Sequence, residues 1–523
     1  MAVNSLLMMG ITAVYVAMML VLGYLGYRKT KKAEDYLVAG RDAHPVVIAL
    51  SYGSTFISTS AIVGFGGAAA AYGMSLIWLT VFNIGIGILL AFVIFGKRTR
   101  EIGQRIKAVT FPDLMGKIYS SQFMQVASGL VIVVAMPLYT AAVLIGGAQF
   151  ITETLGVSYS ASLIGFTLIT AVYVIFGGLI AVMYTDAVQG AIMLVGMTIL
   201  LVATYLILGG VNAAHTSLTA MSNLVPASFA QQGMTGWTTM PIFGSANWLF
   251  VITTLVLGVG IGVLAQPQLV VRFMTAKDNR SLNRAVMVGG PFILMMTGVA
   301  FTVGALTNVY FHQTQGKIAI QMAGTPPNID TIMPIFINSA MPEWFIALFM
   351  ITLLAAAMST LSSLFHAMGT ALICDVWGRG RECALSLKAN KLGVIVMIFA
   401  SVIVAFLMPG SIIAIATTMF MGLCASAFLP VFAVAVYCKK PDLTAAKASL
   451  VIGAITWCLW ALFVNARYSA VFGLAKATLG TPSILSTPWS AIDPIIIALP
   501  LSGLAILILQ ARNCRKNNEN TPS

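Results

Sequence analysis

Long apolar stretches, each close to the length of a membrane crossing, recur along the whole chain. About 20 predominantly apolar residues in a helix cross the hydrocarbon core of a bilayer. Thirteen such stretches can be counted, at residues 5–26, 46–72, 77–96, 123–150, 158–177, 186–210, 247–271, 286–311, 343–373, 392–408, 411–437, 448–466 and 491–511. The pattern predicts an all-α polytopic membrane protein with about 13 transmembrane helices.

The composition agrees with a membrane protein and leaves no room for a soluble domain. The chain has 523 residues, of which 59% are hydrophobic and 8% charged, whereas about 25% of residues are charged in soluble domains. The segments between the apolar stretches contain no hydrophilic block of domain size. We therefore expect residues 1–523 to form a single membrane transport domain.

The basic residues are distributed very unevenly between the two sides of the predicted bundle. If the N-terminus lies outside, 25 of the 28 Lys and Arg residues fall in inner segments, and the outer side keeps Lys317, Arg467 and Lys476. This is the positive-inside rule. The net charge of +13 thus reflects topology, so we expect no nucleic-acid partner. The predicted location is the cell membrane, with an outer N-terminus and a cytoplasmic C-terminus.

Hydroxyl side chains cluster in the middle of the stretch at 343–373. Ser359, Thr360 and Ser363 fall on one helical face with Ala356 one turn earlier, and Ser362 flanks it. An unpaired hydroxyl is costly in hydrocarbon, so the cluster needs a partner such as another helix, water or an ion. Two interpretations follow. The face holds a small cation, or each hydroxyl bonds back to its own helix.

Two stretches resemble interrupted helices. The second carries hydroxyls over 51–60 followed by Gly64, Gly66 and Gly67, and the seventh carries Gly258, Gly260 and Gly262 ahead of Pro267. Interrupted segments at matching positions of two halves indicate a transporter binding site, although small residues also permit close helix packing. The spacing predicts an inverted five-plus-five repeat, with an extra N-terminal helix at 1–30, repeats at 46–210 and 247–437, and two C-terminal helices at 448–511.

Several separated motifs resemble those of one transporter family, the sodium:solute symporters. These are the segment Asp35 to Arg41, the segment Phe176 to Gly190, the pair Gln266-Pro267-Gln268 with Arg272-Phe273, and the segment Ala356 to Ser363. The resemblance implies a leucine-transporter-type core formed by stretches two to eleven. It also implies Na⁺ as the coupling ion.

The resemblance assigns sodium ligands to residues of this chain. The shared sodium site falls on the carbonyls of Ser54, Ile57 and Ala356 and the hydroxyls of Ser359 and Thr360. Some relatives bind a second sodium, whose matching positions here are Asp186, Ser359, Ser362 and Ser363. All four carry oxygen. The alternative interpretation of Asp186 is an N-terminal helix cap at the inner interface.

The substrate assignment rests on the broken stretches. No Lys or Arg is expected in the middle of a span, so an anion would meet helix N-termini, hydroxyls and bound sodium. We expect symport of a small carboxylate such as pantothenate or a monocarboxylate, because the second and seventh stretches resemble the pantothenate-permease branch, with proline or another amino acid as the alternative. The expected substrate residues are Thr55, Phe56, Ser58, Thr59, Ser60, Gly260 and Val263.

Two other classes of protein fit the sequence less well than a symporter. A channel commonly shows a pore loop or rings of like charge, which this chain does not. An enzyme would need a motif such as His-Glu-x-x-His or paired carboxylates within the membrane, and neither is found. We therefore expect no enzyme activity, and a small organic solute and the lipid bilayer as partners of a monomeric chain.

Overall fold

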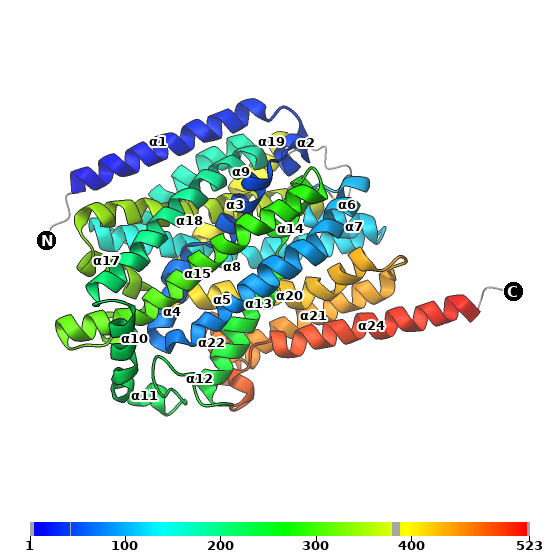
Figure 1. The fold of residues 1–523 in the computed structure, drawn as a ribbon. Coiled ribbons are helices and arrows are strands. Elements are labelled where there is room, and N and C mark those ends of the chain that lie inside the picture. Colours follow the sequence, from blue (N-terminus) through cyan, green and yellow to red (C-terminus); the bar gives the residue numbers. More distant parts are fainter. Residues whose placement is uncertain (1–4, 42, 379–386, 520–523) are drawn as a thin grey trace.

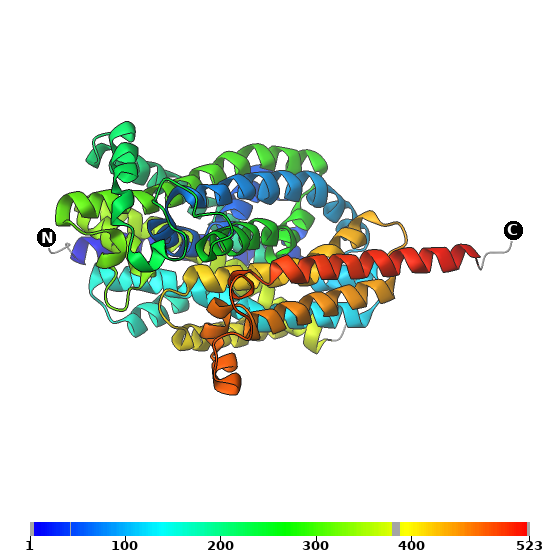
Figure 2. The same ribbon diagram turned by 90° about the horizontal axis from the view of Figure 1, so that it is seen from below.

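The described part of the protein is a bundle of long helices. The computed structural model describes residues 5–41, 43–378 and 387–519. Within these ranges there is no strand, only an isolated bridge between Ala43 and Ala276. Figure 1 shows the long helices side by side along one axis, with the two termini at opposite ends of the bundle. In Figure 2 the C-terminal helix α24 runs along the outside of the bundle.

The elements that run along the bundle, some of them short pieces of one interrupted span, are α1 (Ser5–Lys29), α3 (Pro45–Phe56), η2 (Ser60–Gly64), α4 (Phe65–Tyr72), α5 (Ile77–Ile84), η4 (Gly85–Gly96), α8 (Gln122–Leu155), α9 (Tyr159–Ile207), α12 (Ala246–Leu249), η6 (Phe250–Gly258), α13 (Val259–Gly262), η7 (Val263–Ala265), α14 (Pro267–Thr275), α15 (Asn279–Gln315), α18 (Glu343–Thr370), η9 (Ala371–Trp377), α19 (Leu387–Leu407), α20 (Ile413–Tyr437), α21 (Leu443–Phe463) and α24 (Ile495–Glu519). Segments η2, η4, η6 and η9 are π-helical, and η7 is a 3-10 turn.

Shorter helices connect them: α2 (Ala33–Val38), α6 (Lys97–Arg105), α7 (Phe111–Ile118), α10 (Val211–Ala220), α11 (Ala227–Ala230), α16 (Ala319–Met322), α17 (Ile332–Ala340), α22 (Ala466–Phe472) and α23 (Leu474–Leu479). The remaining 3-10 turns are η1 (Ala39–Arg41), η3 (Gly73–Leu76), η5 (Met221–Leu224), η8 (Ile329–Thr331) and η10 (Trp489–Ala491). Helices α2, α6 and α7 lie at the end of the bundle that carries the C-terminus (Figure 1).

Eleven helices of the described chain are long and apolar enough to cross a membrane, and two of them turn back on themselves. The helix over 159–207 bends at Gly178, where φ is 59° and ψ is −161°. Tyr173, before the bend, and Asp186, after it, both bond to α18. The parts of α9 on either side of Gly178 therefore both lie against α18, as in a hairpin. The stretch over 60–105 turns at Gly73, where φ is 72° and ψ is −156°. Counting each leg, with α3 completing the broken second span, gives the thirteen crossings that the sequence predicts.

The second span is broken, as the sequence predicts. Helix α3 ends at Phe56, Ile57 has extended backbone, and the hydroxyl of Ser58 accepts the N–H of Ser60 at 3.1 Å. Such a local side-chain bond competes with the helical pattern. Helical backbone then resumes through η2 into α4. Gly67 faces the carbonyl of Ile329 so closely that a Cβ would overlap it, which explains the small residues here.

The seventh span is interrupted as well, directly before Pro267 and not at its glycines. Its glycines stay within helical turns, and Gly260 and Gly262 serve close packing against Phe82 and Met421. The break falls at Gln266, where backbone with φ −71° and ψ 119° precedes Pro267, the first residue of α14. Proline has no N–H to donate and suits this first helical position.

Replacement of Gly178 by alanine tests the hairpin of α9. The positive φ disfavours any side chain, and a Cβ would overlap the Tyr36 ring, so Gly178→Ala should cost on the order of 1–3 kcal/mol and lower the midpoint of thermal inactivation in detergent. The matched control is Gly165→Ala in the same helix, where a Cβ meets nothing within 4 Å and helix propensity improves by about 1 kcal/mol. Equal midpoints for both variants would contradict a tight turn at Gly178.

Candidate functional site

The hydroxyls of α18 meet the broken end of α3. Ser359 donates to the carbonyl of Ser54 at 2.9 Å, and Thr360 donates to the carbonyl of Thr55 at 3.0 Å and lies 3.4 Å from that of Ser54. The last carbonyls of a helix have no N–H partner within it. Because α3 stops at Phe56, those of Ser54 and Thr55 are free to accept from α18. The structure thus brings two distant segments together through oxygen atoms.

This cluster has the composition that the expected sodium site requires. The Ser359 hydroxyl also lies 3.2 Å from the carbonyl of Ala356. Ile57 sits at the break itself, its N–H donating to the carbonyl of Gly53 at 2.8 Å. Ser54, Ala356, Ser359 and Thr360 are fully buried, so water does not satisfy them. Hard monovalent and divalent cations favour such oxygen ligands, and this set therefore fits Na⁺.

A buried ion pair lies one helical turn toward the C-terminal end of α18. Nη2 of Arg272 is 2.8 Å from Oδ2 of Asp186, and the two side chains are 1% and 0% exposed. The same carboxylate accepts from the hydroxyls of Ser51 at 2.9 Å, Thr55 at 3.2 Å and Ser362 at 3.2 Å. Helices α3, α9, α14 and α18 meet at this one pair.

Besides Asp186 in α9, the guanidinium of Arg272 donates to groups on three further elements, α3, α14 and α18. Nε donates to Ser51 at 3.0 Å, Nη1 to the carbonyl of Gln268 at 2.8 Å, and Nη2 to Thr55 at 2.7 Å and to Ser363. A buried charge pair is stable only when its remaining hydrogen-bonding capacity is filled. Here hydroxyls and one carbonyl fill it.

Two expectations about charge are corrected by these contacts. Asp186 lies two turns beyond the bend at Gly178, inside α9, so it does not cap a helix. Arg272, which the sequence places among the inner-loop cations, lies buried in α14. The described bundle therefore contains a fully buried salt bridge.

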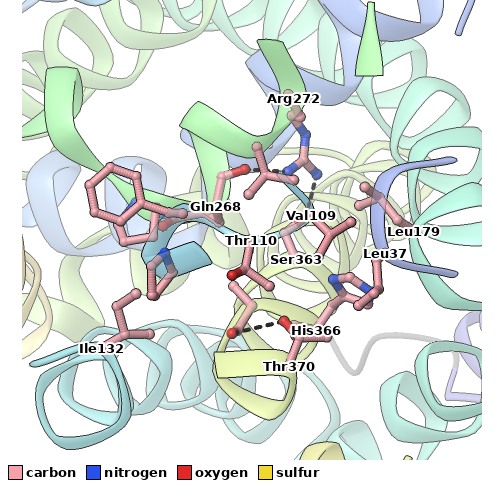
Figure 3. A pocket seen from close by; sticks show the side chains of 15 residues that line it. Leu37, Val109, Thr110, Ile132, Leu179, Gln268, Arg272, Ser363, His366 and Thr370 are labelled. Carbon is pink, nitrogen blue, oxygen red and sulfur yellow. Dashed lines mark hydrogen bonds between the residues drawn. The ribbon is translucent and has the colours of Figure 1, made fainter. Parts of the chain in front are cut away.

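A small cavity of about 20 Å³ lies beside Arg272. Figure 3 shows Arg272, Ser363, His366 and Thr370 around it, with Leu37 and Thr110 on other walls. Its volume is that of about one water molecule. The imidazole of His366 donates from Nε2 to the carbonyl of Tyr36 at 2.8 Å, which anchors α2 over this end of the site.

A second cavity of about 20 Å³ lies at the centre of the bundle, at the break of the second span. Its polar lining comes from Ser58, Ser60, Asn83, Tyr139, Thr297 and Thr417, and its apolar lining includes Phe56, Phe65, Val259 and Phe301. No charged side chain of the described chain lines it. Ser60 Oγ and Asn83 Oδ1 are buried without a hydrogen-bond partner among the described residues, although such groups are normally paired. They are free to bond a ligand.

The expected substrate residues divide into two groups. Phe56, Ser58 and Ser60 line the central cavity. Thr55 instead joins the Arg272 cluster, and Thr59 donates to the carbonyl of Val143 at 2.9 Å. Gly260 and Val263 do not line this cavity; Gly260 packs against Phe82, and Val263 lies beside Gly87.

The sequence did not indicate every residue of the central cavity and of the Arg272 cluster. Thr297 and Thr417 line the cavity from α15 and α20. Both donate to their own helices, at 2.8 Å each, and isolated threonines of this kind give no sequence signal. Arg272 did give a sequence signal. It stands inside the apolar segment Leu269 to Met274, and loops rarely place a cation in such a segment.

The chain has relatives of similar length among characterised transporters. It is 26% identical over 485 residues to the osmoregulated proline transporter OpuE of Bacillus subtilis, covering 91% of each chain. It is 27% identical over 443 residues to a sodium/pantothenate symporter of Haemophilus influenzae, covering 83% of this chain and 85% of the other. A third relative is the sodium/proline symporter 2 of Staphylococcus saprophyticus, 26% identical over 488 residues, covering 91% and 90%.

The fold is likewise shared with a solved transporter. The outward-open, substrate-bound structure of a Na⁺-coupled sialic acid symporter matches with a TM-score of 0.73 at 16% identity and covers 96% of each chain. That similarity establishes the leucine-transporter-type fold. The model of the sodium:solute symporter family matches residues 36–453, most of the chain. The protein therefore belongs to the sodium:solute symporter family.

Proposed function

We propose that this chain imports a small organic solute by alternating access, driven by sodium bound between α3 and α18. The supporting observation is that Ser359 and Thr360 reach the free carbonyls of the broken α3, directly beside the central cavity. One ion there would hold the two elements together and fix the shape of the cavity. Family membership and coupling by Na⁺ agree with this mechanism.

The proposed sodium ligands are the carbonyls of Ser54, Ile57 and Ala356 and the hydroxyls of Ser359 and Thr360. In the structure the two hydroxyls donate to carbonyls. With an ion present, both hydroxyls and carbonyls would turn lone pairs toward it, and the hydroxyl protons would find other acceptors. Binding then exchanges direct bonds between the helices for bonds through the ion, which makes the closure of the second span depend on sodium.

A second sodium at Asp186, Ser362 and Ser363 belongs to the same proposal. The guanidinium of Arg272 stands in that place, bonded to Asp186 and Ser363. Two cations repel each other at such distances, so a second ion binds only after Arg272 withdraws. The exchange would link ion binding to movement of α14.

The proposed solute is a small carboxylate, with pantothenate, a monocarboxylate and proline as the candidates. The uncharged cavity offers hydroxyls and the amide of Asn83. One relative is named for proline and another for pantothenate. Phe56, Ser58 and Ser60 would contact it directly. Because the cavity holds only about 20 Å³, the helices around it must separate before a solute enters.

Positive residues set the proposed orientation. We place the N-terminus outside and the C-terminus in the cytoplasm, since the basic segments around α2, α6 and α7 share one end of the bundle with the C-terminus (Figure 1). An inside-negative potential of 100 mV then contributes about 2.3 kcal/mol for each net positive charge imported.

Uptake into proteoliposomes tests the function itself. Labelled proline, pantothenate, lactate and acetate are offered with an inward sodium gradient or with potassium in its place. We expect saturable uptake of one solute that collapses without sodium. Uptake of none of the four under a sodium gradient would contradict the proposed substrate class, and linear, non-saturating flux would indicate a channel.

Removal of one sodium ligand should weaken sodium dependence. Ser359→Ala and Thr360→Ala each delete a proposed ligand, and a loss of ~1.4 kcal/mol would raise the sodium concentration for half-maximal uptake roughly tenfold. The matched control is Ser401→Ala, because that buried hydroxyl donates to the carbonyl of Met397 in its own helix, away from the proposed ligands. Wild-type sodium dependence in both test variants would exclude these ligands.

Currents measured against solute uptake test the second ion. Asp186→Asn should reduce the charge moved per solute, but it also leaves Arg272 buried without a counter-charge. Ser362→Ala is the milder variant, since it removes one ligand and keeps the ion pair. If both variants move the same charge per solute as the wild type, the transporter carries a single sodium.

The unpaired side-chain oxygen of Asn83 should recognise the solute. Asn83→Ala removes a buried acceptor that faces the cavity, and a lost hydrogen bond worth about 1 kcal/mol would raise the KM for solute about fivefold. Gln149→Ala is the control, since that amide bonds to Glu153 away from the cavity. An effect on sodium dependence larger than the effect on KM would place Asn83 outside the solute site.

A further inference from the structure

A large cavity lies apart from the two sites above, at the end of the bundle that carries the C-terminus. It has a volume of about 540 Å³ and lies between α6, α7 and the last turn of α20. Its basic lining residues are Arg98, Arg105, Lys117 and Lys439, and Glu101 is the one carboxylate on the described lining. The floor is apolar, formed by Ile102, Ala435 and Val436.

Most of the positive charge in this cavity is not neutralised within the protein. Lys117 pairs with Asp113 at 2.8 Å. Arg98, Arg105 and Lys439 form no ion pair with any described residue. The carboxylate of Glu101 already accepts from the amide of Asn279 at 2.8 Å. Arg98, Arg105 and Lys439 therefore leave the cavity with a net positive charge despite the carboxylate of Glu101, which favours an anionic ligand.

The cavity adjoins an exposed apolar surface of the bundle. Helix α6 continues directly from η4, whose side chains Leu90, Val93 and Ile94 are exposed on the outside of the bundle. Tyr437 joins the two regions: its ring is half exposed, its hydroxyl donates to the carbonyl of Ile94 at 2.7 Å, and Arg98 packs over the ring with 5.8 Å to its centre. A tyrosine with one apolar and one polar end is typical of the membrane interface.

We propose that this cavity binds the phosphate headgroup of an anionic phospholipid, whose acyl chains lie along the exposed face of η4. Arg98, Arg105 and Lys439 contact the phosphate, and Leu90, Val93 and Ile94 contact the chains. Basic pockets between transmembrane helices on the cytoplasmic side suit such headgroups. A soluble phosphate would use the same cations, but it would leave the adjoining apolar surface without a role. The proposal is independent of the transported solute.

Native mass spectrometry of the full-length protein, released from detergent with added lipid, tests the site. Phosphatidylglycerol is compared with phosphatidylcholine on the wild type and on Arg98→Gln/Arg105→Gln. Each cation near the surface contributes enough to change lipid affinity about fivefold, so the double variant should bind phosphatidylglycerol about 30-fold more weakly and lose its preference over phosphatidylcholine. The control Arg28→Gln/Lys388→Gln removes two exposed cations outside the cavity and should keep the wild-type preference.

Three results would overturn the proposal. The first is equal retention of phosphatidylglycerol by the wild type and Arg98→Gln/Arg105→Gln. The second is an equal loss in the control pair, which would indicate nonspecific attraction to basic surface. The third is binding of glycerol 1-phosphate as tightly as the lipid, which would assign the cavity to a soluble phosphate. If the double variant is unstable, Lys439→Gln alone should still lower lipid affinity about fivefold.

Discussion

The transport core depends on the backbone carbonyls that α3 exposes where it stops. In hydrocarbon a helix must satisfy its own polar groups, so a break within the membrane is stable only where other protein groups supply the missing bonds. Ser359 and Thr360 supply them to Ser54 and Thr55. The same geometry brings several oxygen atoms of α3 and α18 within hydrogen-bonding distance of one another. The residues that satisfy the break are thus the same ones that the proposed sodium site uses.

The ion pair of Arg272 and Asp186 shares residues with that contact. Thr55 offers its carbonyl to Thr360 and its hydroxyl to Asp186, and Ser363 bonds both to Arg272 and to the carbonyl of Ser359. A change at one cluster therefore reaches the other through two side chains. Because the pair ties together α3, α9, α14 and α18, any opening of this end of the bundle has to loosen it. The buried pair thus joins four helices at that end of the bundle.

Much of the architecture follows from the sequence, because the apolar stretches and the hydroxyl clusters are local patterns. These patterns predicted the thirteen crossings, the broken second span and the hydroxyls of α18 that face the interior of the bundle. What the sequence hides is contact between distant positions. Arg272 and Asp186 are far apart in the chain, so an expected loop cation proves to be the partner of a buried carboxylate. The orientation of Thr55 and Thr59 away from the cavity depends in turn on the exact backbone path at Ile57, which no periodicity reveals.

The central claim is that the oxygens between α3 and α18 hold a sodium ion even before solute binds. Thermal unfolding of the purified wild-type protein, followed in sodium chloride and in potassium chloride at equal ionic strength and without solute, tests it most directly. A ligand that binds only the folded state stabilises it increasingly as its concentration exceeds its Kd. The account predicts that the unfolding midpoint is higher in sodium than in potassium, and that the difference grows as the sodium concentration rises above its Kd. Equal midpoints in the two salts at every concentration would contradict it.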